Sequence, residues 1–381
     1  MANPGVTYEQ WTEARAAHQE HGGYVQAARA LKIPQGTLTN RIKSGDIRFA
    51  GRAGVDTGVP DGYMVKGRST LYDPEGNVKA EWVKTTADRE RLLEIALEAV
   101  HEAAKGLPKL KARPKKDKAY NDDLMTVIPW GDPHFGMYAW GLESGADFDT
   151  DIAKRDLCAA VDYLVSQAPP SRQCVIANLG DFFHADNHAG VTPGHGHSLD
   201  TDTRLQRVIR IGVSAVRQCI ETALDKHEVV QFIPVPGNHD PVLGVAMGVL
   251  LANVYENEPR VIVHDAPTLR FYIRHGKTLL GFVHGDKTKD SGLPGIMATE
   301  RPEDWGASRH RYWFRGHHHH DSRVEFPGCI VEQVRTLAAN DAYAAGGGYL
   351  SGRDMKLIVM HKEHGEVSRT TCSIDMLRES A

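Results

Sequence analysis

Long apolar runs are absent from this sequence of 381 residues. No window approaches the roughly 18 consecutive apolar residues that a membrane-spanning helix requires. The first residues, Met1 to Gly5, also lack the charged and apolar regions of a secretory signal peptide. We therefore expect a cytoplasmic protein that does not interact with a membrane.

Cysteine is also scarce, and its spacing argues against two kinds of site. The five cysteines are odd in number and widely separated, without a CxxC pair. A disulfide framework or a cysteine-rich zinc site would need a different pattern. We expect these residues to remain reduced thiols: Cys158, Cys174, Cys219, Cys329 and Cys372.

The charged residues are unevenly distributed, although the net charge is only −4. Residues 1–120 hold 20 basic and 15 acidic side chains, whereas residues 121–381 hold 25 basic and 34 acidic ones. A mildly basic front and an acidic remainder suggest two different tasks. The length allows two or three domains, and a hydrophobic content of 41% is ordinary for a globular protein.

Three short helices are predicted near the N-terminus, over residues 7–20, 24–31 and 37–43. Thr7 and Gln10 form a capping-box pattern at the start of the first helix. Gly22 is predicted to end the first helix, and the Ser44-Gly45 pair is predicted to end the third.

The second and third helices, joined by a tight turn, make a helix-turn-helix pattern. Residues 22–45 resemble the helix-turn-helix DNA-binding families, and we assign residues 1–48 to such a domain. The alternative is a small helical bundle that mediates protein contacts. The resemblance implies that these side chains face the major groove or the phosphates of DNA: Gln35, Thr37, Thr39, Asn40, Arg41 and Lys43.

Residues 49–104 are predicted to form a linker, a β-hairpin over 63–84 with its turn at 73–76, and a helix over 87–104. Residues 105–120 are basic and interrupted by proline. This stretch is a tether that either adds phosphate contacts or only links two domains.

The pattern changes at residue 121, where strands and helices begin to alternate. Helices are predicted over 149–168, 202–225 and 242–255, between strands at 124–130, 174–179 and 229–235. Strands dominate afterwards, over 261–264, 268–275, 277–284, 311–316, 322–334 and 355–361. An α/β half followed by a strand-rich half predicts two packed sheets flanked by helices.

Five predicted strand ends carry the same chemistry, with a glycine near an Asp, Asn or His residue. In extended backbone, an Asp-x-His or His-x-His spacing puts both side chains on one side. Carboxylate, imidazole and amide groups together suit two divalent ions such as Mn²⁺, Fe²⁺ or Zn²⁺. The five segments are Gly131-Asp132-Pro133-His134, Gly180-Asp181, Gly237-Asn238-His239-Asp240, Val283-His284-Gly285-Asp286 and Gly316-His317-His318-His319.

In this order, the segments resemble the calcineurin-like metallophosphoesterases, whose pattern is D-x-H, G-D, G-N-H-D, H and G-H-x-H. The resemblance covers residues 124–335. It implies a four-layer α/β/β/α sandwich for residues 121–381. It also implies a two-metal site, with Mn²⁺ as the favoured ion, that activates a water to hydrolyse phosphate esters.

The same resemblance implies a role for each motif residue. His239 would be the general acid that protonates the leaving oxygen, and Asp240 would orient it. Asp181 would bridge the two metals. The first metal would be held by Asp132, His134 and His319, and the second by Asn238, His284 and His317.

A long polar loop follows Asp181 and extends to Arg204. Loops at this position line the mouth of the active site, so His184, Asn187 and Arg204 are candidates for contacts with substrate. The alternative is a solvated loop without such contacts. The layout also resembles phage and prophage metallophosphoesterases, which would place the protein in the cytoplasm of a bacterial host.

Three functions are compatible with the sequence. The first is a phosphodiesterase or nuclease that acts on DNA, because a predicted DNA-binding domain precedes the predicted catalytic one. The resemblance adds an analogy, since the nucleases of double-strand-break repair share the five motifs. The second is a phosphomonoesterase that resembles the lambda-type protein phosphatases. The third is a DNA-binding recruitment or regulatory protein in which catalysis is secondary.

Overall fold

The computed structural model describes residues 6–48, 63–72, 78–87, 119–187, 190–194, 196–341, 345–348 and 351–379. The chain divides into two compact units, Met1–Ile95 and Ala96–Ala381. Several predicted features lie outside the described residues: the linker at 49–62, the turn at 73–76, all but the first residue of the helix predicted over 87–104, and most of the basic tether. No helix in the described ranges combines the length and apolarity needed to cross a membrane.

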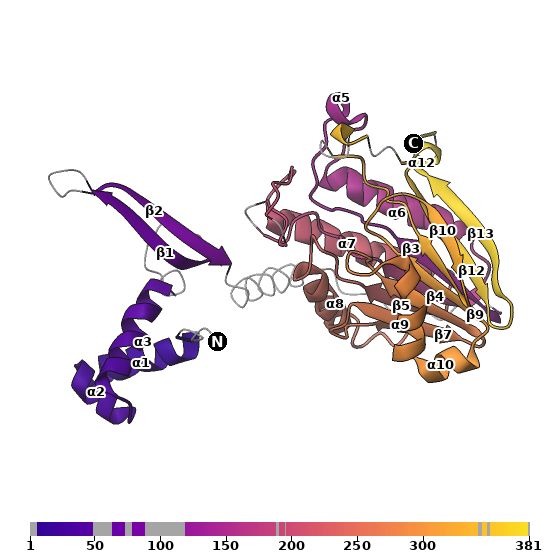
Figure 1. Ribbon diagram of the computed structural model, residues 1–381. Helices are drawn as coiled ribbons and strands as arrows, with labels where there is room; N and C mark the ends of the chain where they lie inside the picture. The colour runs from indigo at the N-terminus through magenta and orange to yellow at the C-terminus, as the bar shows by residue number, and fades with distance from the viewer. Residues whose placement is uncertain are drawn as a thin grey trace. The chain divides into compact units, whose positions relative to one another are not determined.

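The first unit begins with three helices, labelled in Figure 1: α1 (Tyr8–His21), α2 (Tyr24–Ala30) and α3 (Gln35–Arg48). The predicted capping box is confirmed. The Thr7 side chain accepts the Gln10 N–H and the Gln10 side chain accepts the Thr7 N–H, each at 3.2 Å. Gly22 ends α1 with a left-handed φ of 70°.

The predicted end of the third helix at Ser44-Gly45 is wrong, because α3 continues to Arg48. A Cβ atom at Gly45 would overlap the ring of Trp11, so this glycine allows α1 and α3 to pack closely. The indole of Trp11 then donates a hydrogen bond of 2.9 Å to Asp46. Gly45 therefore serves the contact between two helices and does not end one. The buried side chains of this bundle are Ala14, Ala17, Ala27, Ala28, Leu38 and Ile42.

A two-stranded antiparallel hairpin follows in the same unit, formed by β1 (Tyr63–Tyr72) and β2 (Val78–Ala87). Its register pairs Tyr63 with Ala87 and Thr70 with Glu81. The hairpin predicted from alternating residues is confirmed.

The second unit contains a six-stranded mixed sheet with the strand order β13-β12-β3-β4-β5-β6. The four strands from β3 to β6 are parallel, and β12 and β13 extend the sheet in antiparallel fashion. The strands are β3 (Asn121–Trp130), β4 (Ser171–Asn178), β5 (Val229–Pro234), β6 (Val261–Val263), β12 (Asp354–His361) and β13 (Gly365–Ser373). The connecting helices are α6 (Thr150–Gln167), α7 (Leu205–Leu224) and α8 (Leu243–Val254).

A five-stranded sheet, in the order β10-β11-β9-β8-β7, lies in the same unit. Its strands β8, β9 and β11 are parallel to one another. The strands are β7 (Arg270–His275), β8 (Thr278–Val283), β9 (His310–Arg315), β10 (Ser322–Phe326) and β11 (Cys329–Gln333). The helices α9 (Leu293–Glu300) and α10 (Pro302–Ala307) connect β8 to β9.

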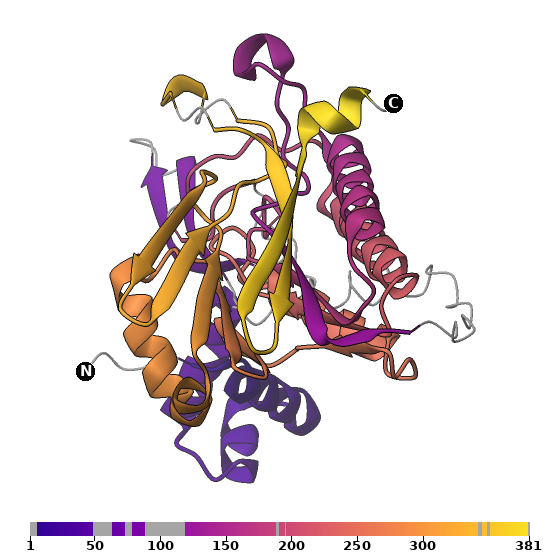
Figure 2. The same cartoon turned by 90° about the vertical axis from the view of Figure 1, so that its right-hand side faces the viewer.

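Alternating side chains of the strands place the two sheets face to face. In β3, Val127 belongs to the apolar cluster between the sheets, whereas Ile128 packs with α6, α7 and α8. In β9, Phe314 faces the same inter-sheet cluster, whereas Trp313 packs against α9. Figure 2 shows both sheets between α6 and α7 on one side and α9 on the other. The described residues thus form the predicted layer order of helix, sheet, sheet, helix.

Some elements of the second unit were predicted incorrectly or missed. The single strand expected over 322–334 is a hairpin, in which Gly328 turns the chain with a φ of 80°. The strand β13 was not predicted because its sequence, Gly-Glu-Val-Ser-Arg-Thr-Thr-Cys-Ser, is polar. It lies at the edge of its sheet, where few of its side chains are buried. The helices α5 (Gly141–Ser144), α9, α10 and α12 (Ile374–Glu379), and the short 3-10 turn η2 (Asp290–Gly292), were also missed.

Candidate metal centre

All seven predicted metal ligands lie in one place, although they come from five strand ends. The parallel strands β3, β4 and β5 present their carboxyl ends at the same edge of the six-stranded sheet, where ligands commonly bind in α/β proteins. The strands β8 and β9 contribute from the facing sheet. Donor atoms of the predicted ligands lie within 4.8 Å of one another in two groups, Asp132, His134 and His319, and Asp181, His284 and His317. A third group of this kind, His134, His184 and His239, shares His134 with the first.

The first group is built around Asp132, whose side chain is fully buried. Its carboxyl oxygens each accept the backbone N–H of His317 at 2.9 Å. The Nε2 atoms of His134 and His319 lie 3.1 Å apart, and Nε2 of His319 lies 3.8 Å from Asp132 Oδ1. Three donors thus face one small volume.

The second group is built around His284. Its Nδ1–H donates to the carbonyl oxygen of Leu179 at 2.9 Å, which directs Nε2 toward the other donors. Nε2 lies 3.2 Å from Asp181 Oδ2 and 2.9 Å from Asn238 Oδ1. The ring of His317 lies beside that of His284, with centroids 5.0 Å apart.

Five of the seven donors have a left-handed backbone. Apart from Lys32, they are the non-glycine residues in the described ranges with positive φ. Such conformations are costly for residues with a Cβ atom and persist where the surrounding structure holds them, often at functional sites. The φ values are 45° for Asp132, 47° for His134, 49° for Asp181, 78° for His317 and 57° for His319.

Two glycines permit the close approach of the strand ends. A Cβ atom at Gly237 would overlap the carboxylate and backbone nitrogen of Asp181. A Cβ atom at Gly316 would overlap the carboxylate of Asp132. The glycines in these motifs are therefore needed for the distance between the donors.

Burial favours the neutral form of most imidazoles in the centre. It lowers the pKa of His134 well below the ordinary value and lowers that of both His317 and His319 to about 4. Neutral imidazole is the form that binds a metal ion. Together with two carboxylates and one amide oxygen, these rings make a donor set that fits divalent Mn, Fe or Zn.

The two carboxylates respond to burial in opposite ways. Burial raises the pKa of Asp132 to about 7. Burial also disfavours the charged form of Asp181, but the neighbouring His284 outweighs it and holds the pKa of this carboxyl below its ordinary value. Despite its own burial, His284 has its pKa raised to about 10 by Asp181 and Asp132. Positive charge is thus favoured at the position of His284.

His239 lies beside the first group and is held by backbone atoms. Its Nδ1–H donates to the carbonyl oxygen of His184 at 2.8 Å. This bond occupies Nδ1, so Nε2 is the ring nitrogen that could exchange a proton with a substrate. Its backbone N–H donates to Asp181 Oδ1 at 2.8 Å. The ring centroid of His239 is 5.0 Å from that of His134.

The sequence led us to expect that Asp240 orients the ring of His239, but the structure gives Asp240 other partners. Its two oxygens accept the backbone N–H groups of Gly237 at 2.9 Å and Phe183 at 3.0 Å. Asp240 therefore joins the strand end after β4 to the one after β5, and the carbonyl of His184 takes the orienting position. Burial raises the pKa of Asp240 to about 6.

The three predicted substrate contacts occupy different environments. His184 is buried, and its Nδ1 lies 3.2 Å from Nδ1 of His134. Burial lowers the pKa of His184 to about 3. The amide of Asn187 closes a loop through hydrogen bonds with the backbone N–H and carbonyl of Val191. Arg204 is exposed and lines a cavity of about 450 Å³.

Two residues of the centre carried no signal in the sequence. Thr336, which lies 204 positions after Asp132, donates its hydroxyl to the backbone oxygen of Asp132 at 2.7 Å. Asp186 accepts the backbone N–H groups of Val242 and Leu243 at 2.9 and 2.8 Å, which fixes the loop after β4 to the start of α8. Only the folded chain brings these partners together.

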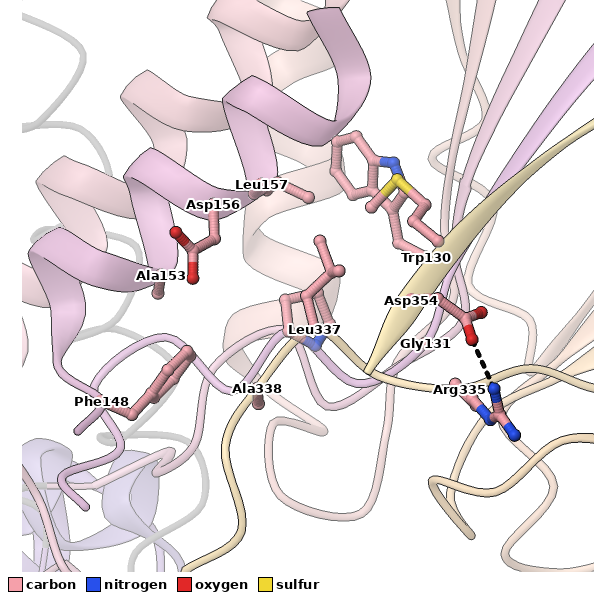
Figure 3. Close-up of a pocket in the computed structure, with 12 residues that line it drawn as sticks. Trp130, Gly131, Phe148, Ala153, Asp156, Leu157, Arg335, Leu337, Ala338 and Asp354 are labelled. Carbon is pink, nitrogen blue, oxygen red and sulfur yellow. Dashed lines mark hydrogen bonds and ion pairs between the residues drawn. The ribbon is translucent and has the colours of Figure 1, made fainter. Parts of the chain in front are cut away.

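A second, much smaller cavity lies behind the end of β3, next to α6. Figure 3 shows it beside Trp130 and Gly131, with Arg335 joined to Asp354 by a hydrogen bond of 2.6 Å. Its volume of about 10 Å³ is close to that of one water probe. This cavity is too small for a substrate, and its lining supports the strand end that carries Asp132.

The predicted DNA contacts lie in the first unit, on α3. Gln35, Thr37, Asn40 and Lys43 are exposed. Thr39 and Arg41 are half-buried. The hydroxyl of Thr39 donates to the carbonyl of Gln35 at 2.9 Å, and the guanidinium of Arg41 lies 3.5 Å from Glu13 of α1.

No family model matches the chain, and no curated protein matches it. Three solved structures with low similarity are an archaeal phosphodiesterase, a predicted phosphoesterase from Streptococcus pneumoniae and Vps29 from Entamoeba histolytica complexed with zinc. Their identities are 10%, 10% and 12%, and their TM-scores are 0.34, 0.28 and 0.29. The alignments cover 66%, 66% and 65% of this chain and 99%, 98% and 99% of the other chains. Similarities of this size carry no argument about function, which rests on the geometry above.

Proposed function

We propose that this protein is a metal-dependent phosphoesterase, and more specifically a phosphodiesterase or nuclease that acts on DNA. The observation that carries the proposal is the convergence of seven donors from five strand ends, six in the two groups and Asn238 beside His284. A histidine outside these seven, His239, lies next to them with one ring nitrogen held by a carbonyl. Two positions for cations and a nearby proton donor are the parts that hydrolysis of a phosphate ester needs.

When bound, two divalent ions would lower the pKa of a water and neutralise charge on the phosphate. The chain supplies the remaining parts. The buried hydrogen bonds of Asp132 and His284 hold the donors in position before substrate arrives. As the water oxygen bonds to phosphorus and loses a proton to solvent, the bond to the leaving oxygen breaks. Nε2 of a protonated His239 then gives its proton to that oxygen.

The preference for DNA is supported by the first unit. Exposed polar and basic side chains lie along α3, including Gln35 and Lys43. The sequence of residues 105–120 adds a basic stretch between that unit and the predicted catalytic domain. Basic side chains of this kind contact phosphates without regard to base sequence.

The test of catalysis measures Mn²⁺-dependent hydrolysis of bis(p-nitrophenyl) phosphate and single-stranded DNA by the full chain. We expect His239→Ala to lower the rate on DNA by about 10²-fold to 10⁴-fold, because the alkoxide leaving group needs a proton. The loss should be smaller on the nitrophenyl diester, whose leaving group is stable as an anion. His320→Ala is the matched control, because His320 is exposed and belongs to neither donor group.

Full activity of His239→Ala on both substrates would contradict the role of the general acid. Faster hydrolysis of p-nitrophenyl phosphate than of any diester would favour a phosphomonoesterase. Binding of DNA by a chain without measurable hydrolysis would favour a recruitment protein.

The test of DNA binding measures affinity as a function of salt. We expect Lys43→Ala to reduce the slope of log K against log salt by about one, because one phosphate contact is lost. Lys362→Ala is the control, because Lys362 follows β12 and pairs with Asp123 near the start of β3, at the end of the sheet opposite the metal centre. An unchanged slope for Lys43→Ala would contradict a phosphate contact at this residue.

A further inference from the structure

The cavity of about 450 Å³ in the second unit has the size of a ligand site. Its lining comes from three segments: the turn after His134, the loop after His184 and the start of α7. These segments contribute Gly136, Ala185, Thr201, Thr203 and Arg204 to the lining.

The cavity adjoins the histidine cluster of the metal centre. Gly136 follows His134 by two residues, and Ala185 directly follows His184. The carbonyl of His184 accepts the Nδ1–H of His239, the proposed donor of a proton to the leaving oxygen. The segments that carry His134 and His184 therefore also form part of the cavity wall.

Polar groups dominate part of the cavity wall, but several of them already have partners. Asp202 accepts the backbone N–H of Thr150 at 3.1 Å, and the amide of Asn187 is bonded to Val191. Thr201 and Thr203, which each carry a hydroxyl group, also line the cavity. A bound group would thus meet hydroxyls on one wall.

Arg204 is the charged group of this wall that has no partner among the described residues. Arg207, one turn later on α7, differs because its guanidinium lies 2.7 Å from Asp151. An exposed guanidinium without a carboxylate partner is suited to bind a phosphate through two parallel hydrogen bonds.

We propose that this cavity binds the leaving nucleotide of the substrate, with Arg204 holding a phosphate next to the scissile one. The inference rests on the proposed phosphodiesterase function and specifies its substrate. A leaving group that carries its own phosphate would be cleaved faster than one without it. The enzyme would thereby favour a nucleic acid chain over a simple diester.

The experiment compares three substrates on the full chain with Mn²⁺: bis(p-nitrophenyl) phosphate, the dinucleotide TpT, and pTpTp. In pTpTp, the nucleoside that leaves carries a second phosphate whichever oxygen departs. We expect the wild type to have a higher kcat/KM for pTpTp than for TpT. Arg204→Ala should lower the ratio of these two values by roughly tenfold or more. The rates of Arg204→Ala on TpT and the nitrophenyl diester should stay within about twofold of the wild type.

Arg210→Ala is the matched control, because Arg210 is an exposed arginine of the same helix that does not line the cavity. A second variant, Thr203→Phe, tests occupancy without changing charge. It should raise KM for both dinucleotides and leave the nitrophenyl diester unaffected, with the melting temperature showing that the fold is intact.

If Arg204→Ala leaves the ratio of kcat/KM for pTpTp to that for TpT unchanged, the inference is overturned. An equal loss of kcat/KM on all three substrates also overturns it. In either case the wild type still cleaves diesters, so the proposed function stands. A wild type that cleaves none of the three overturns the proposed function together with this inference.

Discussion

The two donor groups of the metal centre differ in how their surroundings treat charge. Around Asp132, burial raises the pKa of the carboxyl to about 7, and the neighbouring imidazoles of His134 and His319 favour their neutral forms. Around His284, the carboxyl of Asp181 remains ionised, and the imidazole has a pKa raised to about 10. The second group attracts positive charge more strongly than the first.

From this difference we expect the second group to bind a cation more tightly than the first, once His284 has lost its proton. The distances alone do not separate them, because each set brings three donor atoms within the same 4.8 Å. The contacts made by the two carboxylates distinguish the two groups. Asp132 receives two contacts from the backbone N–H of His317, whereas Asp181 lies beside an imidazole that is favoured in its charged form.

The largest effect is expected from Asp181→Ala, because this substitution should affect both donor groups at once. Asp181 is predicted to bridge both ions, so the variant should lose both of them and hydrolyse no diester measurably. Elemental analysis after dialysis against Mn²⁺ and removal of excess metal would show this. Asp265→Ala, at an exposed position outside the centre, is the control. A content of two ions in the Asp181 variant would reject the bridging role.

His319→Ala and His317→Ala separate the two groups, because each removes one imidazole from one of them. We expect each variant to retain about one ion per chain and to lose more activity than any variant that binds both. The ion retained by His319→Ala should be the more tightly bound one, since it lies with His284 and His317 in the second group. If either variant released both ions together, the two groups would not act as separate sites.

Gly237→Ala and Gly316→Ala disturb the same two groups without removing a donor. The added methyl would overlap Asp181 in the first variant and Asp132 in the second. We expect a loss of about 10²-fold in kcat for each, because displacing a catalytic group by about 1 Å has that effect. Gly295→Ala, where a Cβ meets no atom within 4 Å, should behave as the wild type. Unchanged kinetics in both centre variants would show that the strand ends tolerate separation.

The smallest effect is expected from Thr336→Val, which affects only the first group. The variant removes the hydroxyl that donates to the backbone oxygen of Asp132 and preserves the volume of the side chain. We expect the weaker ion to bind about tenfold less tightly, as for other partners that orient metal ligands. A titration with Mn²⁺ monitored by calorimetry would resolve the two affinities, and equal weakening of both would contradict the assignment to one group.

Local signals in the sequence predicted the early helices and most strands correctly. The capping box of Thr7 and Gln10 and the left-handed Gly22 act within one helical turn, so neighbours in the chain are sufficient to define them. Gly45 failed as a predicted helix end because its role depends on Trp11, a residue of another helix. The polar strand β13 was missed because its pairing with β12, and not its own pattern, makes it a strand.

The sequence by itself determined which chemical groups follow the strand ends, because residue types and a period of two can be read along the chain. The tertiary structure decided how those groups are combined. It joined the ring of His239 to the carbonyl of His184 and not to Asp240, and it brought the hydroxyl of Thr336 to the backbone oxygen of Asp132. These choices depend on contacts between distant segments, which spacing along a single chain does not encode.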